Sequence, residues 1–399
     1  MDRLTLPDAS WRQREGLAEL AAVLSAEDGG ARYVGGAVRD TLLGLPVSDV
    51  DIATPLDPHT VMARLKTAGI KAAPTGIAHG TVTAVLPDGP IEVTTLRHDV
   101  ETDGRRAKVA FTADWQADAA RRDFTMNALY ADPASGEIFD YFAGLEDLRA
   151  GRVRFIGDPL QRIAEDHLRI LRFFRFHARF GDAPDPAGLD ACTARANDLM
   201  ALSRERIAAE LTKLLVAQGA VETVALMLSR GILKPVLPEA ANIERLARVA
   251  AAEAGAGLAP NPIRRLAALL PDDPALGEAV GARLKLSNAD RKRLASALSP
   301  ELADPQPLAY RLGTEGALDR WLLHVPDPIE GARRITAWPL PRFPLTGGAI
   351  VARGIAKGPE VARLLRAVED QWIAEGFPDA ARVEAIADQR VGNALRSAR

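Results

Sequence analysis

What the chain lacks narrows the class of protein it can be. It has one cysteine, Cys192, so no intrachain disulfide can form and a reducing compartment, the cytoplasm, is expected. No apolar run approaches the length of a membrane span. The N-terminus carries Asp2, Arg3 and Asp8 without an apolar segment, so no signal peptide is expected. The net charge of −3 gives no global sign of nucleic-acid binding, so any basic surface must be local.

The chain is otherwise ordinary in composition and long enough for several domains. Hydrophobic residues make up 47% and charged residues 26% of its 399 residues, which is typical of globular proteins with a buried core. At this length two or more domains are expected. There is no fixed-period repeat or low-complexity tract, so motifs and apolar periodicity must locate the domains.

The densest chemical signal lies near the N-terminus. A short apolar run ends in Gly35 and Gly36, and a helix then opens with Arg39 in its first turn. Paired glycines let the backbone bend tightly and approach a ligand, and a helix N-terminus attracts anions such as phosphate. Asp49 and Asp51 alternate along a predicted strand, so both carboxylates point to one face. Adjacent carboxylates repel each other, and a hard divalent cation, most often Mg²⁺ with a phosphate substrate, is their natural occupant.

This stretch, written G-G-x-V-R-D…D-x-D, resembles the signature of the tRNA nucleotidyltransferase and bacterial poly(A) polymerase family. That family belongs to the polymerase-beta-like nucleotidyltransferase superfamily. A Gly-Gly turn or a single D-x-D pair is also common in ordinary loops, whereas their combination at this spacing is more specific. The resemblance implies that Gly36 and Arg39 hold the nucleotide's phosphates and that Asp49 and Asp51 bind the metal.

Apolar periodicity predicts the elements around this motif. The turn at 87–90 between two β-branched runs predicts a hairpin over 81–86 and 91–96. Glu92 stands in the second of these strands, either at an exposed edge position or as a third carboxylate that completes a two-metal cluster for phosphoryl transfer. The other expected elements are helices over 10–28, 37–43 and 58–68 and strands over 32–34 and 50–52.

Residues 97–118 are highly charged, their apolar periodicity is weak, and Gly104 adds backbone freedom. We therefore expect a mobile loop here. A plain solvated excursion has the same composition. In the resembling family, a flexible loop at this position helps to select the incoming nucleotide.

The run 121–129 resembles the family's R-R-D-F-T-x-N-A motif, which holds the ribose and phosphates of the nucleotide. Arginine suits phosphate because its guanidinium is planar and always charged, and a carboxylate suits a ribose hydroxyl because it accepts hydrogen bonds. The resemblance thus implies that Arg122 binds the nucleotide and that Asp123 lies near the 2′-hydroxyl. Residues 140–148 resemble the hinge motif between head and neck, with Ala143 where the family often has a glycine.

Residues 149–180 form a basic segment within a slightly acidic chain, with eight arginines against three acids. A single long helix is expected from Pro159 to Phe180, because its apolar residues repeat on one face and Gly181 follows. A surface helix laced with salt bridges would have the same composition.

Within this segment, Glu165, Asp166 and Arg169 resemble the family's E-D-x-x-R motif. In that family the aspartate and arginine pair with the Watson–Crick edge of the incoming base, one accepting and the other donating hydrogen bonds. The resemblance implies that Asp166 and Arg169 act as a protein template for the base. Arg172 and Arg175, one and two turns further on, are expected to reach phosphates or the base.

Together the motifs imply an α+β chain with a small mixed-sheet nucleotidyltransferase head of the polymerase-beta-like class, followed by an all-α neck, body and tail. The implied domains are the catalytic head at 1–148, the neck for base selection at 149–237, and the body and tail for tRNA binding at 238–399. The implied activity is the addition of C, C and A from CTP and ATP to the tRNA 3′ end, with Mg²⁺ as cofactor and no nucleic-acid template.

Poly(A) or A-only addition is the alternative within the family. Poly(A) polymerases of the family typically carry a G-R-R-F-R run after the third strand, where this chain has Thr75–Val82, and the chain lacks a strongly basic C-terminal extension. Both observations favour CCA addition. A non-catalytic RNA-binding protein on the same scaffold is disfavoured by the intact D-x-D. A small-molecule nucleotidyltransferase would leave the arginine-rich segment and the helical tail unexplained.

Overall fold

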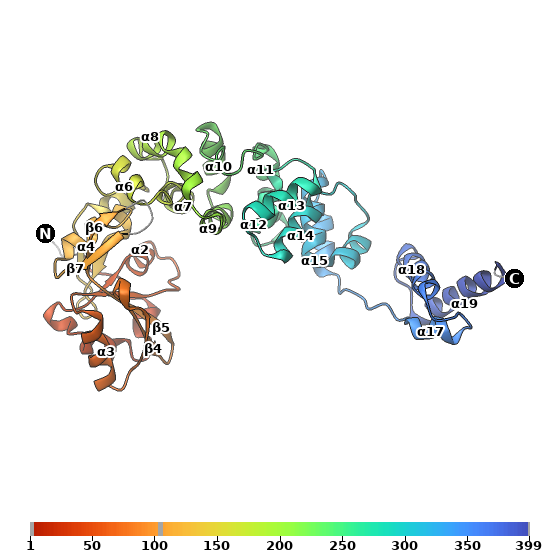
Figure 1. The fold of residues 1–399 in the computed structure, drawn as a ribbon, viewed down its shortest axis with the longest axis horizontal. Helices are drawn as coiled ribbons and strands as arrows, with labels where there is room; N and C mark the ends of the chain where they lie inside the picture. Colours follow the sequence, from red (N-terminus) through yellow and green to blue (C-terminus); the bar gives the residue numbers. More distant parts are fainter. Residues whose placement is uncertain (1–3, 103–106, 398–399) are drawn as a thin grey trace. The chain divides into compact units, whose positions relative to one another are not determined.

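The computed structural model describes residues 4–102 and 107–397, and the chain divides into two compact units, Met1–Ala240 and Ala241–Arg399. All strands of the described residues lie in the first unit, and the second unit is helical (Figure 1). Within the described ranges, no helix combines the length and hydropathy that crossing a bilayer requires.

The first unit is built on a mixed seven-stranded sheet in the order β3-β4-β5-β2-β1-β8-β9. Strands β2 and β5 run parallel and the other neighbours antiparallel, which confirms the expected α+β class. The expected hairpin is confirmed as β4 and β5. The strands are β1 (Arg32–Val34), β2 (Asp51–Thr54), β3 (Lys71–Gly76), β4 (Thr81–Leu86), β5 (Gly89–Thr95), β8 (Leu129–Ala131) and β9 (Ile138–Asp140), with a separate pair β6 (Arg97–Thr102) and β7 (Ala107–Phe111).

The helix expected over 10–28 is wrong, because three short pieces take its place. Gly16 has φ 81°, in the left-handed region, and Ser25 has φ 60°, so the backbone cannot continue as one helix through either residue. The helices and 3-10 turns of the first unit are η1 (Ser10–Gln13), α1 (Leu17–Val23), η2 (Ala26–Asp28), α2 (Gly36–Leu42), α3 (Pro58–Thr67), η3 (Ile77–His79), α4 (Trp115–Ala120), η4 (Thr125–Asn127), α5 (Gly144–Arg149), α6 (Pro159–Glu165), α7 (Arg169–Phe180), α8 (Pro186–Ala194), η5 (Ala196–Ala201), α9 (Arg204–Leu215) and α10 (Ala220–Ser229).

The mobile loop expected over 97–118 is also wrong for the described residues, which form β6, β7 and α4, while Gly104 lies outside the described residues. The high charge of this run predicted a loop in solvent, but one of its acids is buried. Asp118 is 1% exposed, and its carboxylate accepts hydrogen bonds from two arginines and from Tyr130. Asp118 thereby fastens α4 to β8.

The single helix expected from Pro159 to Phe180 is two helices, α6 and α7, and the break falls at Asp166. Asp166 has extended backbone, with φ −151° and ψ 106°. Its carboxylate accepts from the backbone N–H of Leu168 at 3.1 Å, and its carbonyl from that of Arg169 at 3.0 Å. This local turn competes with helical hydrogen bonding, a known behaviour of aspartate. Asp166 therefore does not share a helical face with Arg169.

Aromatic packing joins α7 to the segment that follows α4. Phe155 and Phe173 stack with ring centroids 5.6 Å apart, and Phe124 packs against Phe155 at 4.9 Å and Phe176 at 5.3 Å. Phe124 and Phe173 are fully buried. Because such pairs have preferred geometries and exclude water, the cluster fixes the polar face of α7 relative to residues 121–127.

The expected hinge motif contains a strained residue. Ala143 lies in the left-handed region with φ 58° and ψ 34°, immediately before α5. A side chain at this φ costs of order 1 kcal/mol, whereas glycine adopts it freely. The backbone geometry gives a physical reason for the glycine that the resembling family often has at this position.

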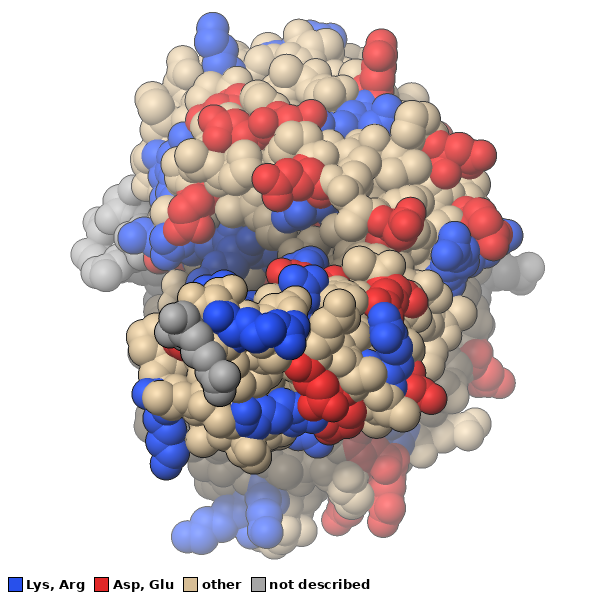
Figure 2. Space-filling model, turned by 90° about the vertical axis from the view of Figure 1, so that its right-hand side faces the viewer, with Lys and Arg blue, Asp and Glu red and all other residues tan. Residues whose placement is uncertain are grey.

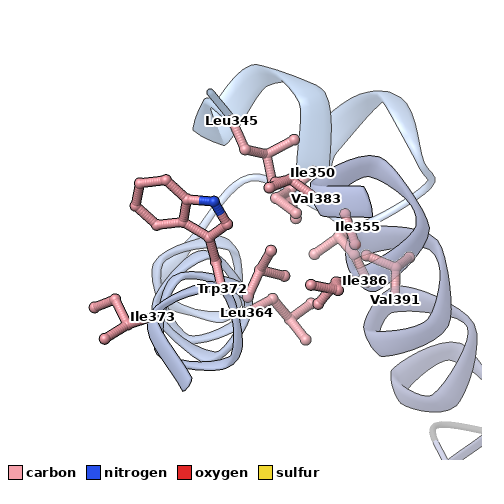
Figure 3. Packing of buried hydrophobic residues seen from close by; sticks show 11 residues of the cluster. Leu345, Ile350, Ile355, Leu364, Trp372, Ile373, Val383, Ile386 and Val391 are labelled. Atoms are coloured by element: carbon pink, nitrogen blue, oxygen red, sulfur yellow. The ribbon is translucent and has the colours of Figure 1, made fainter. Parts of the chain in front are cut away.

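The second unit is helical throughout its described residues, as expected beyond Pro238. One cluster of its buried hydrophobic residues lies among α11, α15 and α16, and another lies among α17, α18 and α19. In the latter, Ile350, Leu364 and Ile386 meet between three helices, and the indole of Trp372 donates to the carbonyl of Pro378 at 2.8 Å (Figure 3). The helices are α11 (Ile243–Ala256), α12 (Pro262–Ala268), α13 (Pro274–Arg283), α14 (Asn288–Ala297), α15 (Pro305–His324), α16 (Ile329–Ala337), α17 (Gly347–Ala352), α18 (Pro359–Ala374) and α19 (Ala380–Ser397).

A buried ionic cluster lies within the second unit. Arg264 is 1% exposed, and its guanidinium contacts Glu253 at 2.8 Å and Asp319 at 2.9 Å, both of which are buried. Asp319 also accepts from Arg293 at 2.8 Å.

On the face that Figure 2 presents, Lys and Arg side chains lie among Asp and Glu side chains, in keeping with the net charge of −3. Local groups of cations must therefore be sought in particular pockets.

Candidate active site

A pocket of about 420 Å³ in the first unit brings together most of the predicted site residues. They come from α2, β2, the segment before η4, the break at Asp166 and α7, which are far apart in the sequence. The predicted residues that line it are Gly36, Arg39, Asp51, Arg122, Asp123, Asp166, Arg169 and Arg172. The others in its lining are Gly35, Asn127 and Phe176.

The turn into α2 requires glycine at its first position. Gly35 has φ 70° and ψ −121°, a conformation that residues with a side chain essentially do not adopt. A Cβ atom on Gly35 would stand 3.4 Å from the guanidinium of Arg122. The turn thus lets the backbone pass close to Arg122 at the edge of the pocket.

A chain of hydrogen bonds orients the cations on one side of the pocket. Arg39 is 5% exposed and donates to Asp40 at 2.7 Å and to the side-chain oxygen of Asn127 at 2.5 Å. Burial lowers the pKa of Arg39, and the charge of Asp40 opposes this effect. The amide nitrogen of Asn127 then donates to Asp123 at 3.0 Å, and Arg172 contacts the other oxygen of Asp123 at 2.6 Å. Asn127 therefore joins two arginines through one aspartate.

Asp123 is already engaged on both carboxylate oxygens. Besides Asn127, its Oδ1 accepts from the backbone N–H of Phe124 at 2.9 Å. Burial acts to raise the pKa of Asp123, but the charge of Arg172 and these hydrogen bonds outweigh it, so its pKa lies below the usual range. Asp123 is thus ionised and fixed beside Arg172. Its expected contact with a ribose hydroxyl stays a prediction.

The acidic side of the pocket is at the start of β2. Asp51 faces Glu92 in the parallel register of β2 and β5. The pKa of Asp51 is raised to about 6, chiefly by burial and by the negative charge of Glu92, while Arg122 opposes the shift. Asp49 is exposed and accepts from the hydroxyl of Ser48 at 2.9 Å. Among the described residues, no three or more His, Cys, Asp or Glu side chains are grouped closely enough to hold a metal ion.

The predicted base-reading pair is held by partners on separate elements. Asp166 accepts from Arg206 of α9 at 2.9 Å, and Arg169 contacts Glu165 at 2.6 Å. Arg169 also donates to the carbonyl of Arg121 at 3.2 Å. Both side chains line the pocket, although they do not lie on one helical face. Sequence reasoning missed the Asp166–Arg206 ion pair, whose partners are 40 positions apart.

Three predicted site residues lie outside the lining of this pocket: Asp49, Glu92 and Arg175. Asp49 comes two residues before Asp51, and Glu92 lies beside Asp51 in register. Arg175 is different, because it contacts Glu210 at 2.6 Å and lines a second pocket. On an ideal helix Arg175 would lie roughly opposite Asp166, so its spacing already signalled a separate position.

The chain is similar in sequence to known proteins. A family model described as "Poly A polymerase head domain" matches residues 31–154, and one described as "Probable RNA and SrmB- binding site of polymerase A" matches residues 183–244. The mitochondrial CCA tRNA nucleotidyltransferase 1 of Mus musculus is 37% identical over 94% of this chain and 90% of its own length. The Homo sapiens protein of the same name is 36% identical over the same shares.

Two solved structures of CCA-adding enzymes resemble this chain over most of its length. The Bacillus stearothermophilus CCA-adding enzyme, in complex with CTP, is 29% identical and has a TM-score of 0.75, over 95% of this chain and 98% of its own. The Thermotoga maritima CCA-adding enzyme, complexed with tRNA, is 19% identical with a TM-score of 0.67, over 98% and 97%, and shares the fold.

Proposed function

The chain belongs to the CCA tRNA nucleotidyltransferase family, and from this premise we propose that it adds C, C and A, taken from CTP and ATP, to the 3′ end of tRNA without a nucleic-acid template. It is a nucleotidyltransferase. The observation that carries the proposal is the pocket itself, where four arginines and three aspartates from distant segments face one cavity. This combination suits a nucleoside triphosphate, which needs cations for its phosphates and directional polar groups for its base.

The phosphates lie against Arg39, Arg122 and Arg172, beside the turn at Gly36. Each arginine is already held by an acid: Arg39 by Asp40 at 2.7 Å, Arg172 by Asp123 at 2.6 Å, and Arg122 by Asp118 at 3.2 Å. The guanidinium groups are therefore oriented before the substrate arrives, which reduces the entropy lost on binding.

Asp49 and Asp51 fit a divalent cation by their chemistry. Their ligand atoms are oxygens, and the carboxylate of Asp51 forms no hydrogen bond or ion pair with another described residue that would compete. Mg²⁺ commonly takes one or two carboxylates together with substrate phosphates, so it does not need a cluster of three protein ligands. Mg²⁺ bound there would acidify the 3′-hydroxyl of the RNA and neutralise charge on the leaving pyrophosphate. Glu92, beside Asp51, stays a candidate third carboxylate.

Asp166 and Arg169 choose the base. An aspartate accepts and an arginine donates, so together they complement the hydrogen-bonding edge of cytosine or adenine. Their partners support this role, because Arg206 and Glu165 fix the two side chains while both still line the pocket.

The three domains expected from the sequence have separate proposed roles. We assign catalysis to a head at 1–148, base selection to a neck at 149–237, and tRNA binding to the helices of 238–399.

We place the protein in the cytoplasm on the strength of its single cysteine. The mouse and human relatives are named mitochondrial, so fractionation of the source cells tests that assignment.

One incorporation assay tests the function. The protein is incubated with tRNA that lacks its 3′ end, with Mg²⁺, and with each nucleotide singly and together, and the products are sequenced. Addition that stops at C-C-A is expected. Long A tails would instead select poly(A) addition, and incorporation that survives in Asp49→Ala would overturn the assignment of that carboxylate.

A further inference from the structure

A second pocket, of about 480 Å³, lies in the first unit and is lined by two later residues of α7. Its walls come from the end of α7, the end of α9 with the residues that follow it, and the segment between α2 and β2. Arg175 and Arg179 contribute from α7, Lys213 from α9, and Leu45 from the segment that leads to Asp49.

Asp40 links this pocket to the nucleotide pocket. One carboxylate oxygen of Asp40 accepts from Arg39 at 2.7 Å, and the other accepts from Arg179 at 3.2 Å. Arg39 lines the first pocket and Arg179 lines the second. The Arg39 guanidinium also lies 4.4 Å from the ring centroid of Phe180, at the end of α7. The two cavities are therefore neighbours that share one acid.

The second pocket carries more positive charge than its acids neutralise. Arg175 pairs with Glu210, which also lies 3.9 Å from Arg172. Arg179 has a side chain that is 45% exposed and shares Asp40 with Arg39. Lys213 is exposed and forms no ion pair with another described residue. A mobile anion is thus electrostatically favoured at this surface.

The same pocket also presents aliphatic groups to solvent. Leu45 is 38% exposed and Val216 is 36% exposed, and Pro46 lies beside them in the lining. Cations next to exposed apolar groups suit a ligand with charged linkers and flat apolar faces. A single-stranded nucleic acid has this chemistry, with phosphates for the cations and bases or riboses for the apolar surface.

We propose that this pocket binds the unpaired 3′ strand of the acceptor RNA, with Arg179 and Lys213 at its backbone phosphates and Leu45 and Val216 against a base or ribose. The inference rests on the proposed function, because nucleotidyl transfer needs a second substrate and the first pocket takes the nucleotide. Leu45, in the wall of this pocket, precedes Asp49 by four residues, and Asp40 joins the two pockets, so RNA held here would lie beside the pocket to which the nucleotide is assigned.

Steady-state kinetics on the full chain test the proposal, with tRNA lacking its 3′ end as one substrate and CTP as the other. Lys213→Gln and Arg179→Gln should each raise KM for tRNA about tenfold, the usual effect of losing a charged phosphate contact. KM for CTP should stay within about twofold of wild type. Lys66→Gln, an exposed lysine on α3, is the matched control and should change neither constant.

Salt dependence provides a second measurement. The slope of log kcat/KM for tRNA against log salt should be shallower in Lys213→Gln by about 0.7, the value for one lost contact to a single strand. Lys213→Arg should restore the wild-type slope. Because Lys213 is exposed, its substitution leaves the core intact, and thermal unfolding at the wild-type temperature verifies this.

Three results would overturn the inference. The first is an unchanged KM for tRNA in both glutamine variants. The second is a raised KM for CTP, which would assign the pocket to the nucleotide. The third is competition by free pyrophosphate that relieves the difference between wild type and Lys213→Gln, which would make it a product site. Wild type that fails to extend tRNA at all would instead refute the proposed function.

Discussion

Asp319→Asn should lower the stability of the second unit and leave the affinity for CTP unchanged. Asp319 is 0% exposed and contacts Arg264 at 2.9 Å and Arg293 at 2.8 Å, and Arg264 is itself 1% exposed. Asp319→Asn keeps the shape of the side chain but removes its negative charge. Arg264 then depends on Glu253, at 2.8 Å, as its one buried acid among the described residues.

The expected cost follows from the burial and the distances. With an effective dielectric constant of about 20, two unit charges about 3 Å apart attract by roughly 6 kcal/mol. Part of this is returned, because the neutral amide of the variant does not have to be desolvated as an ion and Arg264 retains Glu253. Removing one partner of a buried pair typically costs about 3–5 kcal/mol, and we expect this range for Asp319→Asn. For a unit of this size, that lowers the unfolding temperature by roughly 10 °C.

Calorimetry on the full chain measures the effect, with CTP binding as a separate readout. The unfolding transition of the second unit should shift, and the affinity for CTP should remain that of wild type. Glu278→Gln is the control, since its contact with Arg291 is partly exposed, at 44% and 33%, and such pairs contribute about 0–1 kcal/mol. A loss below about 1 kcal/mol in Asp319→Asn would refute the argument.

Three further outcomes are expected in the first unit. Arg206→Ala should raise misincorporation about tenfold, as Asp166→Ala should, because Asp166 loses its partner at 2.9 Å; sequencing of single-nucleotide products measures both. Asp123→Asn should cost about 2 kcal/mol at pH 7. The pKa of Asp123 is lowered in the folded protein, so its stabilising effect is complete at pH values above the pKa of aspartate in the unfolded chain. This effect is lost as the pH falls through the lower pKa of the folded state, so the cost of Asp123→Asn should shrink near pH 3. Urea unfolding at both pH values checks this. Gly35→Ala should cost about 1–3 kcal/mol and reduce CTP incorporation, because φ is 70° there; urea unfolding and the incorporation assay measure the two effects.

Short-range patterns predicted most of the head. The β4–β5 hairpin, the Gly-Gly turn and the alternating aspartates each depend on neighbours within a few residues, so local rules identified them. The same rules failed at Asp166, where a side chain that accepts from the backbone N–H of Leu168 ends a helix whose apolar periodicity continues. They failed again at 97–118, because the burial of Asp118 depends on Tyr130, which comes 12 positions later.

The four arginines that line the first pocket show why the sequence predicted the site only in part. Each is held by an acid, and in three of the four pairs that acid lies within four positions along the chain. The pairs are Arg39–Asp40, Arg122–Asp118, Arg169–Glu165 and Arg172–Asp123. Only the fourth pair has partners 49 positions apart, so local sequence patterns could not predict it. That pair joins α7 to the 121–127 segment, so it holds two walls of the pocket together.

This arrangement also accounts for the stability of so many cations around one cavity. Without substrate, the acids behind the arginines offset their mutual repulsion, so the pocket stays formed. If this pocket takes a triphosphate, as we propose, its oxygens would meet guanidinium groups that are already oriented. Asp166 and Arg169 are held in the same way, by Arg206 and Glu165. If Asp166 and Arg169 choose the base, as we propose, substitution of Arg206 or Glu165 should alter base choice while the lining itself remains unchanged.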